Sequence, residues 1–215
     1  MQVLFSDRRI DYDGSQLRSG WLAGQFGLAP DAEGAVAAFL GGCDVKPEFV
    51  VDLEEVASGE PIRAALMLHF IAEFPERDLE KAVLRQRLLA ATVRDQLAAR
   101  VTGASTAVVV PNAQCPMPKA RSAPSSAVRA PVIVRLGDDL YDGEFKLSVS
   151  IATLSPVSAL VHFAINVDPA GAPVPARGLL HYGVDPRELA EAVLNTYSAE
   201  TSGVRRTVGK VRPVP

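Results

Sequence analysis

The stretch from Phe145 to Val167 constrains the fold more than any other part of the chain, because it predicts two paired strands. Apolar and polar residues alternate from 145 to 151 and again from 160 to 167, with Thr, Ser and Pro residues between the two runs. Alternation with a period of two is typical of strands that are buried on one face. We therefore expect an antiparallel hairpin with one apolar and one polar face.

The polar face of this hairpin is predicted to carry a lysine, a histidine and an asparagine. A reversal centred on Pro156 places Lys146 opposite Asn166 and Ser150 opposite His162. Paired residues on one face have Cβ atoms roughly 5 Å apart. The residues around them are small: Ser148, Ser150 and Ala164. This pattern suits the floor of a ligand site with one amine on it, although a hairpin with a merely solvated polar face would alternate in the same way.

Length and charge limit the classes of protein to consider. The 215 residues, 48% of them hydrophobic, allow one large domain with a packed core. A formal net charge of −3 gives no bulk attraction to nucleic acid. The N-terminal run MQVLFSDRRIDYDG lacks the apolar core of a signal peptide, and no apolar stretch approaches ~18 residues. We expect a cytoplasmic protein that binds neither nucleic acid nor membranes.

The other segments predict an α+β fold with a mixed or antiparallel sheet flanked by helices. Helices are expected at 16–26, 79–99 and 186–199, and further strands at 3–5, 35–40, 49–53 and 132–136. Residues 1–203 are expected to form a single domain, with a Pro/Ser-rich insertion at about 111–131. Residues 204–215 are basic and predicted to be a flexible tail. Exposed hairpin edges would allow a homodimer.

A second candidate site follows the strand at 35–40. Gly41 and Gly42 allow either the close approach of another group or a plain turn. Cys43 and Asp44 come next, so Cys43 is either a nucleophile, half of a metal site or a buried structural cysteine. A metal-dependent enzyme using Cys43, Asp44 and His69 is one hypothesis, although His69 lies on an apolar stretch that favours a core histidine.

Arg85 is the candidate anion ligand on the predicted 79–99 helix, where it lies near the apolar stripe. A guanidinium at a buried edge can clamp a carboxylate or a phosphate. It can equally pair with Glu73 or Glu80 of this chain.

Several motifs resemble those of the superfamily of biotin protein ligases, lipoate–protein ligases and octanoyltransferases. The segment Lys146-Leu147-Ser148 resembles the Lys-hydrophobic-small motif of the ligases, and 164–167, Ala-Ile-Asn-Val, resembles their Gly-Ile-Asn-Val. Residues 137–140, Gly-Asp-Asp-Leu, resemble the Pro-Asn-Asp strand, and Gly41-Gly42 an Arg-Gly-Gly loop. His162 matches a histidine of octanoyltransferases. The glycine- and arginine-rich loop of the ligases is not recognisable, and residues 176–178 lack the octanoyltransferase cysteine.

The chain resembles an uncharacterised archaeal and bacterial family, a domain of unknown function, more closely still. The segments that carry this resemblance are IDYDGSQL, GCDV, MLHFIAEF, LRQRLL and KLSVSIATLSPVS. This second resemblance implies no activity.

The superfamily resemblance implies acyl or adenylyl transfer on a small carboxylic acid or an acyl carrier, with ATP and Mg²⁺. Lys146 would stabilise negative charge at the reacting carbonyl, His162 would act as general base, and Asn166 would orient the substrate or support Lys146. Asp138 and Asp139 would hold a metal bound to nucleotide phosphates or a substrate amine. The substrate-binding set would be completed by Gly41, Gly42, Cys43, Asp44, Arg85, Ser148 and Ser150. The alternative is a non-catalytic binder with the same pocket.

Overall fold

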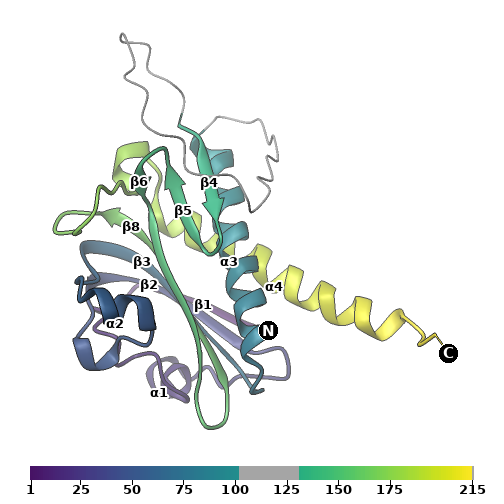
Figure 1. Cartoon of the computed structure of the whole chain (residues 1–215). Coiled ribbons are helices and arrows are strands. Elements are labelled where there is room, and N and C mark those ends of the chain that lie inside the picture. The colour runs from purple at the N-terminus through teal and green to yellow at the C-terminus, as the bar shows by residue number, and fades with distance from the viewer. Residues whose placement is uncertain (102–130, 215) are drawn as a thin grey trace.

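A five-stranded sheet organises the molecule, which is described by a computed structural model for residues 1–101 and 131–214 (Figure 1). Its strand order is β1-β2-β3-β8-β7. The strands are β1 (Gln2–Ser6), β2 (Ala35–Asp44), β3 (Arg63–Phe74), β8 (Ala159–Asp168) and β7 (Ser148–Leu154). β1 runs parallel to β2 and all the other pairs are antiparallel. The predicted class, a mixed sheet flanked by helices, is confirmed.

Two long helices cover one face of this sheet (Figure 1). They are α3 (Leu79–Val101) and α4 (Pro186–Lys210). Asp185 caps the start of α4, because its side chain accepts a hydrogen bond from the Glu188 amide. Every second residue of β8 belongs to the large core beneath them: Val161, Phe163, Ile165 and Val167. The alternation in 160–167 therefore identified the face of β8 that the helices bury.

The opposite face carries the N-terminal segment and the connection between β2 and β3. The N-terminal segment includes α1 (Trp21–Phe26), which is shorter than the predicted 16–26 helix because Gly20 has a left-handed φ of 73°. The connection includes η1 (Pro47–Phe49) and α2 (Leu53–Ser58). The predicted strand at 49–53 is wrong, because the Asp52 side chain caps α2 by accepting the amides of Glu54 and Glu55.

A smaller sheet of β4 (Ile133–Leu136), β5 (Asp139–Asp142) and β6 (Phe145–Lys146) lies beside the large one, and η2 (Leu179–Tyr182) precedes α4. The chain passes from β6 to β7 at Leu147, whose amide donates to the Leu140 carbonyl while its carbonyl accepts the Asn166 amide. The expectation of one continuous strand from 145 to 151 is therefore wrong. Leu147 is buried in the helix-side core, whereas Val149 packs on the opposite face.

The register of the hairpin differs by one residue from the prediction. Ser150 pairs with Phe163, and Ile151 pairs with His162. The reason is the four-residue loop from 155 to 158, in which the Ser155 hydroxyl accepts the amide of Ser158 at 2.8 Å. A loop with an even number of residues has its centre between two residues, so a reversal centred on Pro156 itself misplaces every pair.

Two further expectations concern the insertion at 111–131 and the C-terminal segment. The predicted insertion at 111–131 falls almost entirely outside the described residues. Residues 204–210, expected to be a flexible tail, are helical and continue α4. Within residues 1–101 and 131–214, none of the helices combines the length and the apolar character needed to cross a membrane. The number of domains stays a prediction.

Candidate functional site

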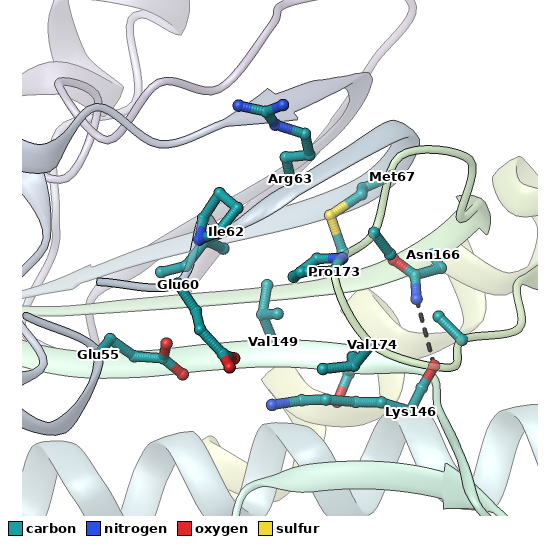
Figure 2. A pocket seen from close by; sticks show the side chains of 14 residues that line it. Glu55, Glu60, Ile62, Arg63, Met67, Lys146, Val149, Asn166, Pro173 and Val174 are labelled. Carbon is teal, nitrogen blue, oxygen red and sulfur yellow. Dashed lines mark hydrogen bonds between the residues drawn. The ribbon is translucent and has the colours of Figure 1, made fainter. Parts of the chain in front are cut away.

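A cavity of about 130 Å³ lies on the face of the sheet that α3 and α4 leave uncovered (Figure 2). Its walls come from the ends of three sheet strands, from the β2–β3 connection with α2, and from the segment 172–176. Lys146, Ser148 and Asn166 are the predicted site residues that line it. The cavity therefore brings together the lysine and the asparagine of the predicted polar face.

The backbone of Lys146 is hydrogen-bonded to a neighbouring segment, and its side chain is paired with a carboxylate. Its amide donates to the Pro175 carbonyl at 2.9 Å, and its ammonium lies 2.8 Å from Oδ2 of Asp139. Partial burial alone would lower the pKa of Lys146, but the Asp139 carboxylate outweighs it and raises that pKa above its ordinary value. The side chain is thus a protonated cation at the wall of the cavity.

Asn166 connects the two chain segments that meet at Lys146. Its Nδ2 donates to the carbonyls of Lys146, at 3.4 Å, and of Arg177, at 3.2 Å. The second segment can approach β8 this closely because residue 178 is glycine: a Cβ there would lie 2.5 Å from the carbonyl oxygen of Val167. The contacts place Asn166 where it supports the backbone of Lys146.

The remaining walls combine apolar and charged side chains that sequence reasoning missed. Ile62, Met67, Val149, Pro173 and Val174 form the apolar part. The charged part is formed by Glu55, Glu60 and Arg63 from the β2–β3 connection and the start of β3, and in Figure 2 both glutamates extend toward the side of the cavity that Lys146 enters. The proline-rich run 173–175 was the one available signal for this wall.

A second cavity, of about 420 Å³, adjoins the first. The two share Glu55, Glu60, Pro61, Ile62 and Arg63 as lining residues. The first cavity is smaller than the about 300–1,000 Å³ typical of ligand pockets, whereas the second lies within that range.

His162 does not line either cavity, which corrects the expected grouping of lysine, histidine and asparagine. It is buried, with Tyr12 stacked on it at a ring-centre distance of 3.9 Å. Its Nε2 lies 3.1 Å from Nδ1 of His69, and Nε2 of His69 lies 3.3 Å from the Gly41 carbonyl. Because a carbonyl can only accept, His69 Nε2 donates and His69 Nδ1 accepts from His162.

Burial keeps both histidines neutral. It lowers the pKa of His69 to about 4, against the smaller opposing effect of the Gly41 carbonyl. Burial, followed by the neighbouring His69, lowers the pKa of His162 well below its ordinary value. A neutral pair sealed under Tyr12 is part of the core, and we do not assign His162 the role of general base.

Gly41 and Gly42 meet a segment of this chain instead of a ligand. A Cβ on Gly41 would lie 1.8 Å from the carbonyl oxygen of Ile10, and the amide of Gly42 donates to Oδ1 of Asp11 at 2.8 Å. The close approach that the glycines allow is therefore used by residues 10–12, which carry Tyr12 onto the histidine pair.

Cys43, Asp44 and His69 do not come together as a metal site. Cys43 is buried, and burial raises the pKa of its thiol to about 12. Asp44 is exposed and pairs with Arg63 at 3.3 Å. In the described part of the chain, no group of three or more His, Cys, Asp or Glu side chains is arranged to hold a metal ion. This geometry gives no support to the metal-dependent alternative.

Three other predicted site residues, Arg85, Asp138 and Ser150, do not line the cavity. Arg85 pairs with Glu76, and its guanidinium lies 4.0 Å from the ring centre of Phe74. Gln86 of α3 donates to Asp138 and to Ser150, both at 2.6 Å. Ser150 therefore faces the helices, which follows from the break at Leu147. Ser148 differs, since its hydroxyl donates to Asp139 while it lines the cavity.

The sequence matches the DUF366 family, described as a domain of unknown function, over residues 1–107 and 127–212. An uncharacterised protein of Methanocaldococcus jannaschii is 27% identical over 221 residues, covering 100% of this chain and 86% of its own. A protein of unknown function from Pyrococcus horikoshi has a solved structure with a TM-score of 0.81 and 33% identity, and the match covers 100% of this chain and 99% of that one.

Solved structures of the biotin/lipoate protein ligase superfamily are more distant structural neighbours. The biotin protein ligase from Aquifex aeolicus matches with a TM-score of 0.52 and 14% identity, over 95% of this chain and 71% of the ligase. The same ligase in complex with biotin and ATP matches with a TM-score of 0.50 and 14% identity, over 93% and 69%. At this identity the likeness shows a shared fold, as the motifs around Lys146 and Asn166 predicted.

Proposed function

We propose that this chain, which belongs to the DUF366 family of unknown function, is an acyl- or adenylyl-transfer enzyme. Its substrate would be a small carboxylic acid or an acyl carrier. The observation that carries the proposal is Lys146, a cation at the wall of a largely apolar cavity, within a fold shared with biotin protein ligases.

The chemistry that suits this arrangement is the stabilisation of negative charge. An ammonium held at a fixed place is a compact point charge, and charge that develops on a carbonyl or phosphoryl oxygen near it is stabilised in the transition state. The contact with Asp139 supplies a resting place for the amine until substrate arrives. Asn166 contributes by holding the Lys146 carbonyl, and so acts on the position of the lysine.

ATP is the co-substrate we propose, since a neighbour of the same fold is described with biotin and ATP bound. In adenylyl transfer, a carboxylate oxygen of the acid attacks the α-phosphorus, and pyrophosphate leaves. Mg²⁺ would bind chiefly through the nucleotide, because Mg²⁺ often takes one or two carboxylates and completes its shell with phosphates and water.

The test is ATP–pyrophosphate exchange with a panel of small carboxylic acids of increasing chain length. We expect one or a few short acids to support exchange, and Lys146→Ala to reduce it by about 10²–10³-fold. Lys81→Ala is the matched control, because Lys81 is an exposed lysine that pairs with Glu76 on the far side of the sheet. Exchange that is absent with every acid would contradict adenylyl transfer, and exchange that is unchanged in Lys146→Ala would contradict the role of the lysine.

The second candidate is a binder that holds a small anion in the same cavity without chemistry. The same variant separates the two, since an enzyme loses turnover in Lys146→Ala while ligand binding can persist. A ligand that binds the wild type tightly but is recovered unchanged after incubation with ATP and Mg²⁺ would favour the binder.

A further inference from the structure

The C-terminal end of α4 extends away from the body of the molecule (Figure 1), and valines on this end are exposed. Val204 and Val208 are one helical turn apart, with exposed fractions of 56% and 72%, and Val211, 68% exposed, follows directly after the end of the helix in an extended conformation. Residues 203–212 also contain four basic residues and no acidic one: Arg205, Arg206, Lys210 and Arg212. We refer to residues 203–212 as the basic arm.

The β2–β3 connection exposes a second group of apolar side chains, of the opposite charge. Residues 47–62 carry five acidic residues and neither lysine nor arginine. Phe49, Val51, Leu53 and Val56 are all exposed there, and Leu53 is 82% exposed. Four exposed apolar side chains within eight residues are more than the single ones expected on a monomer. We refer to residues 47–62 as the acidic surface.

The acidic surface also contains a groove. The cavity of about 420 Å³ is bordered by Pro47, Val50, Val56 and Gly59 of this segment, and also by Lys46 and Arg63, which are paired with Asp13 and Asp44. An amphipathic helix that binds a partner places side chains at i, i+4 and i+7 into such a groove. Val204 and Val208 have the i, i+4 part of this spacing, and Arg206 and Lys210 beside them would face the glutamates next to the groove, whereas Arg205 donates to the Ala32 carbonyl of its own chain.

The arm cannot reach the acidic surface of its own chain. α4 is continuous to Lys210, and in Figure 1 its C-terminal end lies at the opposite side of the molecule from α2. We therefore propose that the basic arm of one copy docks on the acidic surface of a second copy of this chain. The two contacting surfaces differ, so two copies form a two-fold dimer if each arm docks on the other copy, and a ring if the contact runs head to tail.

Sedimentation of the full chain at several concentrations tests the proposal. We expect a species of at least twice the monomer mass of 22.8 kDa, and a shift toward monomer when salt rises from about 0.1 M to about 1 M, which shortens the Debye length from about 10 Å to about 3 Å. Val208→Asp is expected to weaken association at least tenfold. Val157→Asp, at another exposed valine, is the control that should leave the mass unchanged.

Mixing two variants distinguishes this contact from a contact between two arms. Leu53→Asp damages the acidic surface and Val208→Asp damages the arm, and each alone should be monomeric. Their mixture should form dimers, because the intact arm of one variant meets the intact surface of the other. A monomeric wild type overturns the proposal, as does a mixture that stays monomeric although circular dichroism shows both variants folded.

Discussion

His162 and Asn166 lie on the same face of the same strand, yet they are in opposite environments. His162 is covered by Tyr12 and bonded to His69, and burial keeps it neutral. Asn166 lines a cavity beside a charged lysine. The difference arises from what covers each end of β8: residues 10–12 seal the first, whereas the connection with α2 leaves a space over the second. A polar residue on a sheet face acquires its role from the segment above it.

The largest loss of stability is expected from Gly41→Ala, which would push residues 10–12 away from the end of β8 that they cover. The new Cβ would lie 1.8 Å from the backbone oxygen of Ile10, and a backbone atom cannot move aside as a flexible side chain does. We expect the free energy of unfolding to fall by about 3 kcal/mol or more. Gly42→Ala is the control, since its nearest contact is a side-chain oxygen of Asp11 at 3.3 Å. Equal losses in urea titrations of the two variants would show that residues 10–12 do not seal the pair.

Acid should destabilise the sealed end by protonating its histidines. The pKa of His69 is about 4 in the fold and 6.5 when unperturbed, so between these values the unfolded state binds more protons. The stabilisation contributed by neutral His69 is fully present above pH 6.5. It is lost as pH falls toward 4, which lowers the free energy of unfolding by about 3 kcal/mol for His69 alone. Tyr12 and Asp11 are the other titratable groups near the pair.

The measurement is unfolding free energy against pH for wild type and for a His69→Gln/His162→Gln double variant. The double variant should lose most of the slope between pH 6.5 and 4, even if it is less stable throughout. A wild-type slope that survives in the double variant would place the titrating groups elsewhere.

The sequence could reveal which residues share a face of β8, but not which segments of the chain cover that face. Alternation within one strand is a local property, and it identified the buried row from Val161 to Val167 correctly. Whether His162 is sealed depends on Tyr12, which lies 150 positions away in sequence. The same limit applies to Gly41-Gly42, where the pattern allowed either a close approach or a plain turn, and the segment that approaches, residues 10–12, lies elsewhere in the chain.

The expected pairing of Lys146 with Asn166 illustrates a second limit, the geometry of turns and breaks. The predicted register was wrong by one residue, and the break at Leu147 moved Lys146 into the small sheet. The two residues nevertheless line one cavity, because the side chain of Asn166 reaches the carbonyl of Lys146. The roles of these residues in catalysis stay predictions.

A smaller effect is expected from Asn166→Ala at the open end. The variant loses hydrogen bonds to the carbonyls of Lys146 and Arg177, both of which water could partly replace beside a cavity. We expect the free energy of unfolding to fall by about 1 kcal/mol. Pyrophosphate exchange should fall as well, because the backbone of Lys146 loses its support. Asn195→Ala, on α4 and outside the site, is the control, and a loss of activity without any change in stability would point to direct contact with substrate.

The smallest effect on stability is expected from Lys146→Ala, the variant with the largest expected effect on activity. The ion pair with Asp139 is partly exposed, with 27% and 21% of the two side chains accessible, so solvent screens much of the attraction. Asp139 would keep the hydrogen bond from Ser148 and its access to water. We therefore expect urea denaturation to show a change of less than about 1 kcal/mol. A loss comparable to that of Gly41→Ala would mean that Lys146 is as structural as the histidine pair, and the contrast between the two ends of β8 would fail. A small loss, together with abolished exchange, would mean that burying part of an ammonium at this cavity serves the reaction and contributes little to the fold.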